Sequence, residues 1–378
     1  MGVYKTAYLS IGSNLGNREI LLQKAIFEIG NKAGEIRQVS AIYETPSWGF
    51  EAEDFLNACI EVQTLLSPED LLYELLRIET DFGRERTNST SYQSRTLDID
   101  IIYYENKIIE SNTLTIPHPK MQERKFILKP LADITPQFYH PILNKDTRNL
   151  LQGCKDKSII IKLPKKLFKN RHSLFASFEY MAIEGNIGAG KTTLATKISD
   201  DFNAKLILER FAENPFLPSF YEDQSRYAFP LEMSFLADRY QQFREDTNQL
   251  DLFKSFMVSD YDIYKSLIFA KVTLQQNEFE LYRKVFNFMY KEVKKPKIYV
   301  YLYQTTERLL QQIKKRGRDY EQNIELSYLE RINRGYFDFL KTYPKENQIV
   351  IDVSDLDFVS HNSDYEAILS KIEDFALS

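Results

Sequence analysis

The chain has 378 residues, about twice the usual length of one domain, so we expect two domains. Hydrophobic residues make up 43% and charged residues 27%, which excludes disordered and low-complexity chains. A net charge of −5 argues against a nucleic-acid partner, and no apolar run is long enough for a membrane span. The only cysteines, Cys59 and Cys154, support neither a disulfide framework nor a zinc site. We therefore expect a cytoplasmic enzyme that acts on small molecules.

The first half of the chain alternates segments with strand and helix periodicity. Ser67 and Pro68 are a typical N-cap and first residue of a helix. The predicted elements are a strand over 4–11, a helix over 20–29, strands over 36–43 and 58–65, a helix over 67–78 and a strand over 97–103. This βαββαβ order is typical of a ferredoxin-like α+β domain, with a four-stranded antiparallel sheet and helices on one face.

A basic segment separates the two halves. Residues 163–178 lose the apolar periodicity and are rich in Lys and Arg, so we interpret them as a linker between domains 1–162 and 179–378. The basic run could also bind phosphate or RNA, but a solvated connector is the simpler interpretation.

Two aspartates mark the sharpest motif of the first half. On a strand with a period of two residues, Asp98 and Asp100 project from one face. Adjacent carboxylates suit Mg²⁺ bound together with substrate phosphates, whereas the alternative is a solvated strand face. Arg84, Arg86 and Arg95 flank the pair and favour the metal site.

Three further features extend this site. The loop 87–94 has few apolar residues and is of the kind that closes over a ligand. His118 lies in an extended segment between two prolines, and Arg124 follows it. Arginines that bind phosphate and carboxylates that bind metal together indicate a polyphosphate site.

These motifs resemble those of the 6-hydroxymethyl-7,8-dihydropterin pyrophosphokinases, which transfer the β,γ-diphosphate of ATP to a pterin alcohol. The resemblance covers nearly all of residues 4–160. The shared segments are IGSNLGN at 11–17, TPSWGF at 45–50, DFLNA at 54–58, GRER at 83–86, RTLDIDI at 95–101, IPHPKM at 116–121 and RKFIL at 124–128.

The resemblance implies roles for individual residues. Asp98 and Asp100 would hold two Mg²⁺ ions. The residues that would contact the ATP phosphates and the reacting oxygens are Arg84, Arg95, His118 and Arg124. The residues that would bind 6-hydroxymethyl-7,8-dihydropterin are Thr45, Phe55, Asn57 and Phe126. Phe55 and Tyr92 replace the tyrosine and tryptophan of many relatives, and both keep an aromatic plane.

The second half opens with a phosphate-binding loop. The sequence fits GxxxxGK[ST], follows a predicted strand over 180–183 and begins a helix that includes Leu194 and Ile198. We expect its backbone amides to surround ATP, Lys191 to reach the phosphates and Thr192 to bind Mg²⁺. The loop residues in question are Gly185, Asn186, Gly188, Ala189, Gly190, Lys191, Thr192 and Thr193. The expected fold is an α/β P-loop kinase domain with a parallel sheet.

A second basic motif follows the predicted helix 306–313. Arg316 and Arg318 flank a glycine and are typical of a lid that reaches the transferred phosphate, although an exposed basic helix end is the alternative. With the phosphate loop, this motif resembles the deoxynucleoside kinases over nearly all of 180–375. The shared segments are IEGNIGAGKTTL at 183–194, ENPF and FYED within 213–223, FLADRYQQF at 235–243, and RGRDYEQ with LSYLERI within 316–332.

By this resemblance, Glu209 occupies the position of the general base for the sugar 5′-hydroxyl. Tyr221 and Glu321 correspond to the pair that holds the 3′-hydroxyl, and Arg239 to a residue that helps to read the base. The acidic-Arg-Ser segment of the family appears here as Ser259, Asp260 and Tyr261, so only Asp260 remains from it and the arginine is missing. Glu232 stands where a glutamine usually reads the base.

A purine deoxynucleoside is the expected substrate, because the Glu232 carboxylate suits the adjacent N1–H and N2–H donors of guanine. Alternatively, Glu232 pairs with Arg239 two helical turns later.

The sequence thus predicts a bifunctional enzyme that uses ATP and Mg²⁺. Its expected roles are diphosphate transfer to the pterin in folate biosynthesis and 5′-phosphorylation of a deoxynucleoside in salvage, with a homodimer through the kinase domain as a candidate assembly. Two alternatives stay open. The C-terminal half would be a nucleoside monophosphate kinase, or the N-terminal half a non-catalytic binding module.

Overall fold

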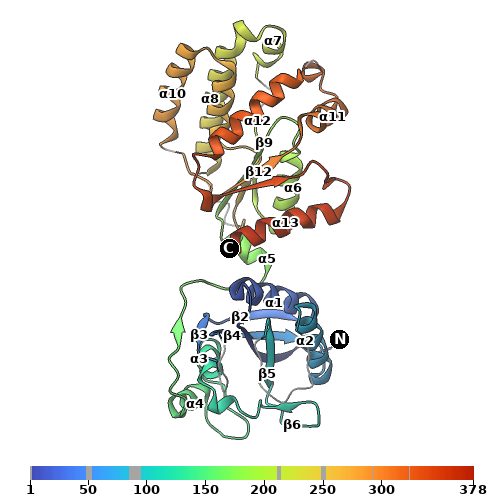
Figure 1. Cartoon of the computed structure of the whole chain (residues 1–378), viewed down its shortest axis with the longest axis vertical. Helices are drawn as coiled ribbons and strands as arrows, with labels where there is room; N and C mark the ends of the chain where they lie inside the picture. Colours follow the sequence, from blue (N-terminus) through green and yellow to red (C-terminus); the bar gives the residue numbers. More distant parts are fainter. Residues whose placement is uncertain are drawn as a thin grey trace. The chain divides into compact units, whose positions relative to one another are not determined.

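The computed structural model describes residues 2–47, 53–84, 95–210, 214–247, 253–291, 293–322 and 324–378. The chain divides into two compact units (Figure 1). Unit 1 comprises Met1–Leu174 with Leu377–Ser378, and unit 2 comprises Phe175–Ala376. The predicted closing loop 87–94 with its Tyr92, and the flanking Arg86, lie outside the described residues.

Unit 1 is built on an antiparallel sheet. Its strands are β1 (Lys5–Ser13), β2 (Glu35–Val39), β3 (Tyr43–Thr45), β4 (Phe55–Thr64), β5 (Asp98–Tyr104) and β8 (Ile161–Lys162), with a separate pair, β6 (Ile109–Glu110) and β7 (Thr115–Ile116). Its helices are α1 (Arg18–Lys32), α2 (Pro68–Asp81), the 3₁₀ turn η1 (Met121–Glu123), α3 (Lys125–Ile134) and α4 (Thr147–Gly153). The sheet order is β5-β1-β4-β3-β8, and β2 also pairs with β4.

Period-two alternation gives this sheet two buried faces. Leu9 and Ile11 of β1 belong to one apolar cluster with residues of α1 and α2, whereas Tyr8 belongs to a second cluster with residues of α3 and α4. The predicted start of α2 is confirmed, because the Ser67 side chain accepts a hydrogen bond from Asp70 N–H and Pro68 is the first helical residue.

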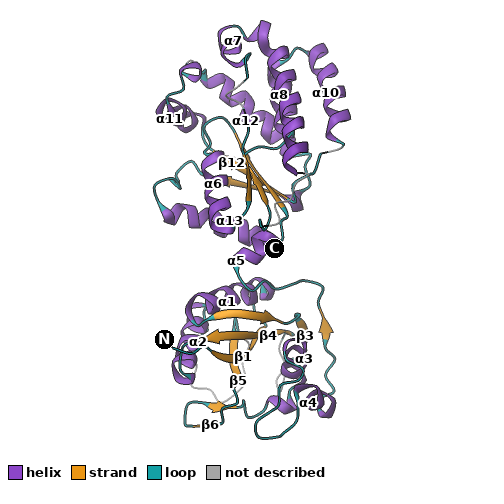
Figure 2. Ribbon diagram, turned by 180° about the vertical axis from the view of Figure 1, so that it is seen from behind, coloured by secondary structure: helices purple, strands orange, loops and turns teal. Residues whose placement is uncertain are grey.

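Two expectations for unit 1 are wrong in detail. The predicted strand over 36–43 is two strands, because the Ser40 hydroxyl accepts the Cys59 N–H at 2.9 Å in place of a backbone carbonyl. Helices cover both faces of the sheet and not one, since α3 and α4 pack against the face opposite α1 and α2 (Figure 2).

The basic segment 163–178 makes specific contacts. The Gln23 side chain, 1% exposed, donates to Phe168 O at 2.7 Å and accepts from Phe168 N–H at 2.6 Å. Leu163 and Leu167 pack against the core of unit 1, and Lys165 pairs with Glu19 at 2.8 Å. The segment also contains the short helix α5 (Arg171–Ala176). It is therefore packed along part of its length and is not a fully solvated connector.

Unit 2 is an α/β fold. Its parallel sheet has the order β10-β11-β9-β12-β13, with β9 (Tyr180–Gly185), β10 (Lys205–Ile207), β11 (Met257–Ser259), β12 (Ile298–Tyr303) and β13 (Gln348–Asp352). Its helices are α6 (Lys191–Phe202), α7 (Leu217–Glu222), α8 (Gln224–Thr247), α9 (Tyr264–Thr273), α10 (Gln276–Tyr290), α11 (Thr306–Arg316), α12 (Leu326–Leu340) and α13 (Asn362–Leu377), with 3₁₀ turns η2 (Asp319–Glu321) and η3 (Lys345–Asn347). The parallel sheet expected for this half is confirmed.

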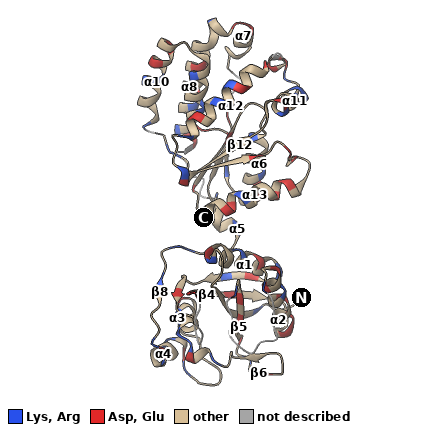
Figure 3. Ribbon diagram, in the orientation of Figure 1, with Lys and Arg blue, Asp and Glu red and all other residues tan. Residues whose placement is uncertain are grey.

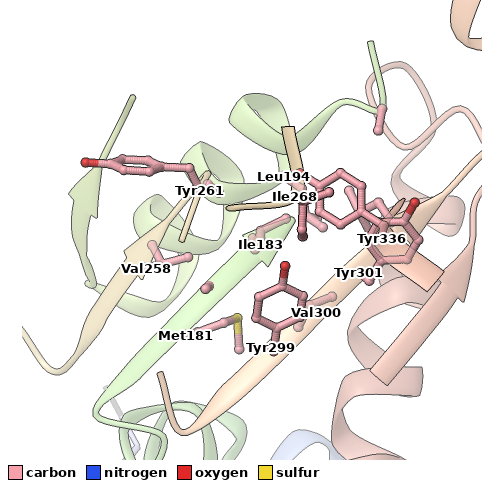
Figure 4. Packing of buried hydrophobic residues seen from close by; sticks show 14 of the residues in the cluster. Met181, Ile183, Leu194, Val258, Tyr261, Ile268, Tyr299, Val300, Tyr301 and Tyr336 are labelled. Atoms are coloured by element: carbon pink, nitrogen blue, oxygen red, sulfur yellow. The ribbon is translucent and has the colours of Figure 1, made fainter. Parts of the chain in front are cut away.

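The core of unit 2 surrounds this sheet. Figure 4 shows Met181 and Ile183 of β9 beside Val300 of β12, with tyrosines from β12 and α12 close by. The ring centroids of Tyr301 and Tyr336 are 4.9 Å apart, and the Tyr336 hydroxyl donates to Glu184 Oε2 at 2.8 Å. Glu184 is fully buried, so this bond satisfies a charged group inside the core.

Charge and hydropathy agree with the composition. Acidic and basic residues occur side by side in both units (Figure 3). Within the described ranges, no helix has the length and apolar character that crossing a membrane requires.

Candidate active sites

The first candidate site lies on the face of unit 1 that α3 covers. Asp98 is directly opposite Gly12 of β1, and Gly12 is opposite Asn57 of β4. Residues directly opposite each other on neighbouring strands project to the same face. The row Asp98–Gly12–Asn57 therefore joins the predicted metal site to the predicted pterin site.

Arginines surround the first carboxylate. Asp98 Oδ1 lies 2.9 Å from Arg84 Nη1 and 2.7 Å from Arg95 Nη1. Arg84 is also paired with Glu79, which is 1% exposed and accepts the Ile99 N–H at 2.8 Å. Sequence analysis missed Glu79, which lies in the polar run Glu79-Thr80-Asp81 at the end of α2 and carries no local signal. The ion pair with Glu79 therefore holds the Arg84 guanidinium in contact with Asp98.

The second carboxyl group, that of Asp100, has a raised pKa. Desolvation and the neighbouring charge of Asp98 raise the pKa of Asp100. His118 Nε2 lies 4.0 Å from Asp100 Oδ2, and burial lowers the pKa of His118 to about 4. Arg124 is 9% exposed, and its positive charge stabilises ionised Asp100.

These two carboxylates fit Mg²⁺. Both project from one face, both are partly exposed, and their mutual repulsion favours a cation between them. Among the described residues, no group of three or more His, Cys, Asp or Glu side chains could hold a metal ion. A pair of carboxylates is nevertheless the usual protein share of a Mg²⁺ site whose other ligands are phosphates and water.

The predicted pterin residues lie at the other end of the row. Asn57 Nδ2 donates to Thr45 Oγ1 at 2.8 Å, and both side chains are buried. A Cβ on Gly12 would lie 3.0 Å from Asn57 Oδ1, so the glycine leaves room for this amide. Phe55 is opposite Thr45, and the Phe126 ring centroid is 5.6 Å from the Arg124 guanidinium carbon.

The second candidate site begins at the phosphate loop between β9 and α6. Gly185 and Gly190 have φ values of 154° and 87°, which side chains rarely allow. A Cβ on Gly185 would lie 2.6 Å from Leu302 O, and one on Gly190 would lie 2.6 Å from Phe358 Cζ. Lys191 Nζ donates to Asn186 O at 2.9 Å, which folds its side chain over the loop.

The rest of the loop is fixed from outside. The Asn186 side chain donates to Leu329 O and to Asn333 Oδ1, each at 2.8 Å. Ala189 is fully buried, whereas Thr193 is partly exposed within the first turn of α6. The loop therefore presents its backbone from a rigid frame.

A cavity of about 110 Å³ extends from this loop. Its lining includes several predicted site residues: Gly188, Lys191, Thr192, Glu209, Tyr221, Glu232, Arg239, Asp260, Arg316, Arg318 and Glu321. The remaining loop residues Gly185, Asn186, Ala189, Gly190 and Thr193 lie beside it. The structure thus brings the residues that are expected to contact phosphate, sugar and base into one pocket.

Glu209 is the centre of the charges in this pocket. Arg239 Nε and Nη2 donate to Glu209 Oε1 at 2.8 and 2.5 Å, and Lys265 Nζ donates to Oε2 at 2.5 Å. Although burial opposes ionisation, the positive charges of Lys265 and Arg239 lower the pKa of Glu209 to about 2. Sequence analysis missed Lys265, which lies 56 residues from Glu209 and meets it only in the folded chain.

Asp260 connects Glu209 to the phosphate loop. The Glu209 N–H donates to Asp260 Oδ1 at 2.8 Å, and the Thr192 hydroxyl donates to Asp260 Oδ2 at 2.5 Å. Thr192 is exposed at the cavity, so its hydroxyl oxygen fits Mg²⁺ as a hard ligand next to the phosphates.

Glu232 lies deeper in the pocket. Its side chain is 2% exposed; Oε1 accepts from the Thr273 hydroxyl at 3.2 Å, and Oε2 has no hydrogen-bond partner among the described residues. Burial raises the pKa of Glu232 to about 7. Arg239 donates to Glu209 and, at 2.6 Å, to the Ser266 hydroxyl, so the alternative ion pair with Glu232 is not formed.

The two lid arginines meet one carboxylate. Arg318 Nη1 is 3.3 Å from Glu321 Oε1, and Arg316 pairs with Glu321 Oε2. Between them, Gly317 ends α11 with a φ of 74°. Tyr221 lines the same cavity and packs edge-on against Phe220, with ring centroids 5.4 Å apart.

The comparisons match each unit to a known family. The family model described as "Deoxynucleoside kinase" matches residues 181–377. The family model described as "7,8-dihydro-6-hydroxymethylpterin-pyrophosphokinase" matches residues 8–136. A deoxyguanosine kinase of Bacillus subtilis is 39% identical over 200 residues, covering 52% of this chain and 96% of that protein. A 2-amino-4-hydroxy-6-hydroxymethyldihydropteridine pyrophosphokinase of Aquifex aeolicus is 37% identical over 141 residues, covering 37% of this chain and 86% of that protein.

Among solved structures, a deoxyadenosine kinase from M. mycoides with products dCMP and a flexible dCDP bound has a TM-score of 0.45 and 28% identity. The match covers 52% of this chain and 99% of that one. The two family matches fall on different units and together span both candidate sites. The chain therefore belongs to the dihydropterin pyrophosphokinase family through its first half and to the deoxynucleoside kinase family through its second, and it is a bifunctional kinase.

Proposed function

We propose that unit 1 transfers diphosphate from ATP to 6-hydroxymethyl-7,8-dihydropterin, a step of folate biosynthesis, and that unit 2 phosphorylates the 5′-hydroxyl of a purine deoxynucleoside in nucleotide salvage. The paired carboxylates of β5 between two arginines support the first activity. The cavity that joins the phosphate loop to Glu209 and Glu232 supports the second.

In unit 1, Asp98 and Asp100 would hold Mg²⁺, which supplies neutralisation of charge on the transferred phosphate. Arg84 and Arg95 already lie against Asp98, and guanidinium groups are of the kind that grip phosphate oxygens. Arg124 and His118 would complete the phosphate contacts.

The pterin would bind at the opposite end of the same row of residues. The Asn57 amide and the Thr45 hydroxyl supply donors and acceptors for its ring nitrogens and oxygens. Phe55 and Phe126 would stack on its two faces. This placement directs the hydroxymethyl group toward the carboxylates, because both subsites share one face of three neighbouring strands.

In unit 2, the loop amides and Lys191 would bind the ATP phosphates, and Thr192 would hold Mg²⁺. Glu209 would accept the proton of the 5′-hydroxyl as that oxygen attacks the γ-phosphorus. The lid residues Arg316 and Arg318 would break their ion pairs with Glu321 and contact the transferred phosphate instead. Glu321, once released, and Tyr221 would then hold the 3′-hydroxyl.

The Glu232 carboxylate supports a purine, and guanine above adenine. Its oxygen Oε2 lacks a partner in a pocket where an unpaired polar group is costly. Guanine offers adjacent N1–H and N2–H donors that satisfy both oxygens, and adenine offers only its amino group. The similarity to a protein named deoxyguanosine kinase agrees with this choice.

One set of assays tests both halves. Steady-state kcat/KM values for deoxyguanosine, deoxyadenosine, deoxycytidine and thymidine should be highest for deoxyguanosine; a pyrimidine ranked first would refute the purine assignment. An unchanged ranking in Glu232→Gln would remove this residue from the argument. Faster phosphorylation of dGMP than of deoxyguanosine would favour a monophosphate kinase. Formation of AMP only when the pterin is present separates catalysis from a non-catalytic binding module.

The remaining assignments belong to the same proposal. We assign unit 1 to the ferredoxin-like class, supported by the antiparallel order β5-β1-β4 with β2 and β3 on the far side of β4. We assign the domains to 1–162 and 179–378, a cytoplasmic location to the protein, and a homodimer to the kinase half.

A further inference from the structure

We propose that Lys265 is a positioning residue for phosphoryl transfer in unit 2, holding one carboxylate oxygen of Glu209 in place of the arginine that is missing beside Asp260. The inference rests on the proposed role of Glu209 as the base. It deepens that role by naming a second cation which the base requires.

Two cationic side chains bind different carboxylate oxygens of Glu209. Lys265 Nζ lies 2.5 Å from Oε2, whereas both contacts of Arg239 are made to Oε1. The three side chains are 5–10% exposed, so water does not substitute for either partner. Each carboxylate oxygen therefore has its own buried positive charge, and the plane of the carboxylate is fixed.

The residue that follows Asp260, Tyr261, cannot supply the charge of the missing arginine. Tyr261 is fully buried, and its ring lies 4.9 Å from the ring of Phe243. Lys265 follows four residues later in the first turn of α9. Its Nζ lies 5.6 Å from the Phe269 ring centroid, which supports the extended side chain on its way to Glu209.

Lys265 also acts on the phosphate side of the cavity. Lys191 of the phosphate loop lines the cavity together with Lys265. The two ammonium groups thus share one cavity, with Glu209 beside Lys265 and the phosphate loop beside Lys191. In the reaction, the 5′-oxygen forms its bond to the γ-phosphorus, the bond from that phosphorus to the β,γ-bridging oxygen breaks with its electron pair leaving on ADP, and Glu209 takes the hydroxyl proton. Lys265 keeps its own protons throughout.

The test compares Lys265→Met, which removes the charge, with Lys265→Arg, which keeps it. Lys271→Met is the matched control, because Lys271 is an exposed lysine of the same helix. We expect Lys265→Met to lower kcat for deoxyguanosine by roughly 100-fold, as loss of a positioned base would. The KM for ATP should change little, and Lys265→Arg should recover at least about a tenth of the activity.

A pH profile separates positioning from a merely structural role. The groups that face Glu209 are Lys191, Glu232, Arg239, Asp260, Tyr261, Lys265 and, from α12, Tyr336. Loss of the Lys265 charge raises the pKa of Glu209 from about 2 toward its ordinary value. The profile of kcat/KM for Lys265→Met should therefore fall between pH 6 and pH 4 more steeply than the wild-type profile.

Three results would overturn the proposal. They are wild-type kcat in Lys265→Met, an equal loss of activity at every pH, and failure of Lys265→Arg to exceed Lys265→Met. Urea unfolding followed by far-UV circular dichroism controls for folding of unit 2 in each variant. Glu209→Gln distinguishes the two levels of inference, since full activity in that variant would refute the base itself and leave Lys265 nothing to position.

Discussion

Glu232→Gln should make unit 2 more stable while it impairs recognition of guanine. The folded pKa of Glu232, about 7, lies above its ordinary value of 4.5 because the carboxyl is buried. Ionised Glu232 therefore destabilises the fold above pH 7. This penalty shrinks as the pH falls from 7 to 4.5 and is absent below, where folded and unfolded chains are both protonated.

The magnitude follows from the pKa difference. Each pH unit corresponds to about 1.4 kcal/mol, so the ionised carboxylate costs about 3 kcal/mol in the ligand-free protein. Glutamine keeps an acceptor for the Thr273 hydroxyl but places an amide donor where Oε2 lacks a partner. That unpaired donor costs about 1–2 kcal/mol, which leaves a net gain of about 1–2 kcal/mol at pH 8.

Urea unfolding of the full chain at pH 8 and pH 5 measures this gain. Far-UV circular dichroism follows the unfolding of both units, and the transition that responds to Glu232→Gln is that of unit 2. Asp238→Asn is the control, because Asp238 is an exposed carboxylate on the same helix. It should leave the free energy of unfolding unchanged at both pH values. A Glu232→Gln protein that is no more stable than wild type at pH 8 would refute the reasoning, as would an equal gain at pH 5.

Four other substitutions test the two sites and the core. Asp98→Ala or Asp100→Ala should abolish transfer to the pterin and leave deoxynucleoside phosphorylation near the wild-type rate; substantial pterin activity in both variants would exclude the metal site. Lys191→Ala should lower kcat of the deoxynucleoside reaction by orders of magnitude with the pterin reaction unaffected, and parallel loss of both in a folded protein would contradict independent sites. Tyr336→Phe should lower the unfolding free energy of unit 2 by about 2 kcal/mol in urea, because it deprives buried Glu184 of its 2.8 Å hydrogen bond; an unchanged midpoint would show that Glu184 finds another donor.

Local spacing made parts of both sites predictable from the sequence. Asp98 and Asp100 share a face because a strand repeats every two residues, and the phosphate loop follows β9 because its glycines and lysine occur at fixed intervals. Family resemblance supplied residues far apart in sequence, such as Glu209 and Arg318, which line one cavity in the structure.

What sequence reasoning missed depends on packing between distant segments. Lys265 and Glu79 carry no local signal, since each acquires its role only by meeting a charge from another element. The interruption of the predicted strand at Ser40 arises because a hydroxyl replaces a ladder carbonyl, which apolar alternation does not reveal. The partner of Arg239 also had to be seen, because helical spacing offered Glu232 as an alternative, whereas the fold pairs Arg239 with Glu209.

Gly185 and Gly190 of the phosphate loop differ in the kind of atom that a new side chain would meet. A methyl group at Gly190 meets a ring, Phe358, that a second substitution to a smaller residue would remove, so that only the cost of its φ of 87° would remain. At Gly185 the obstacle is the carbonyl oxygen of Leu302, which every amino acid possesses. No partner mutation restores that space, so Gly185 is closed to substitution for as long as β9 and β12 remain neighbours.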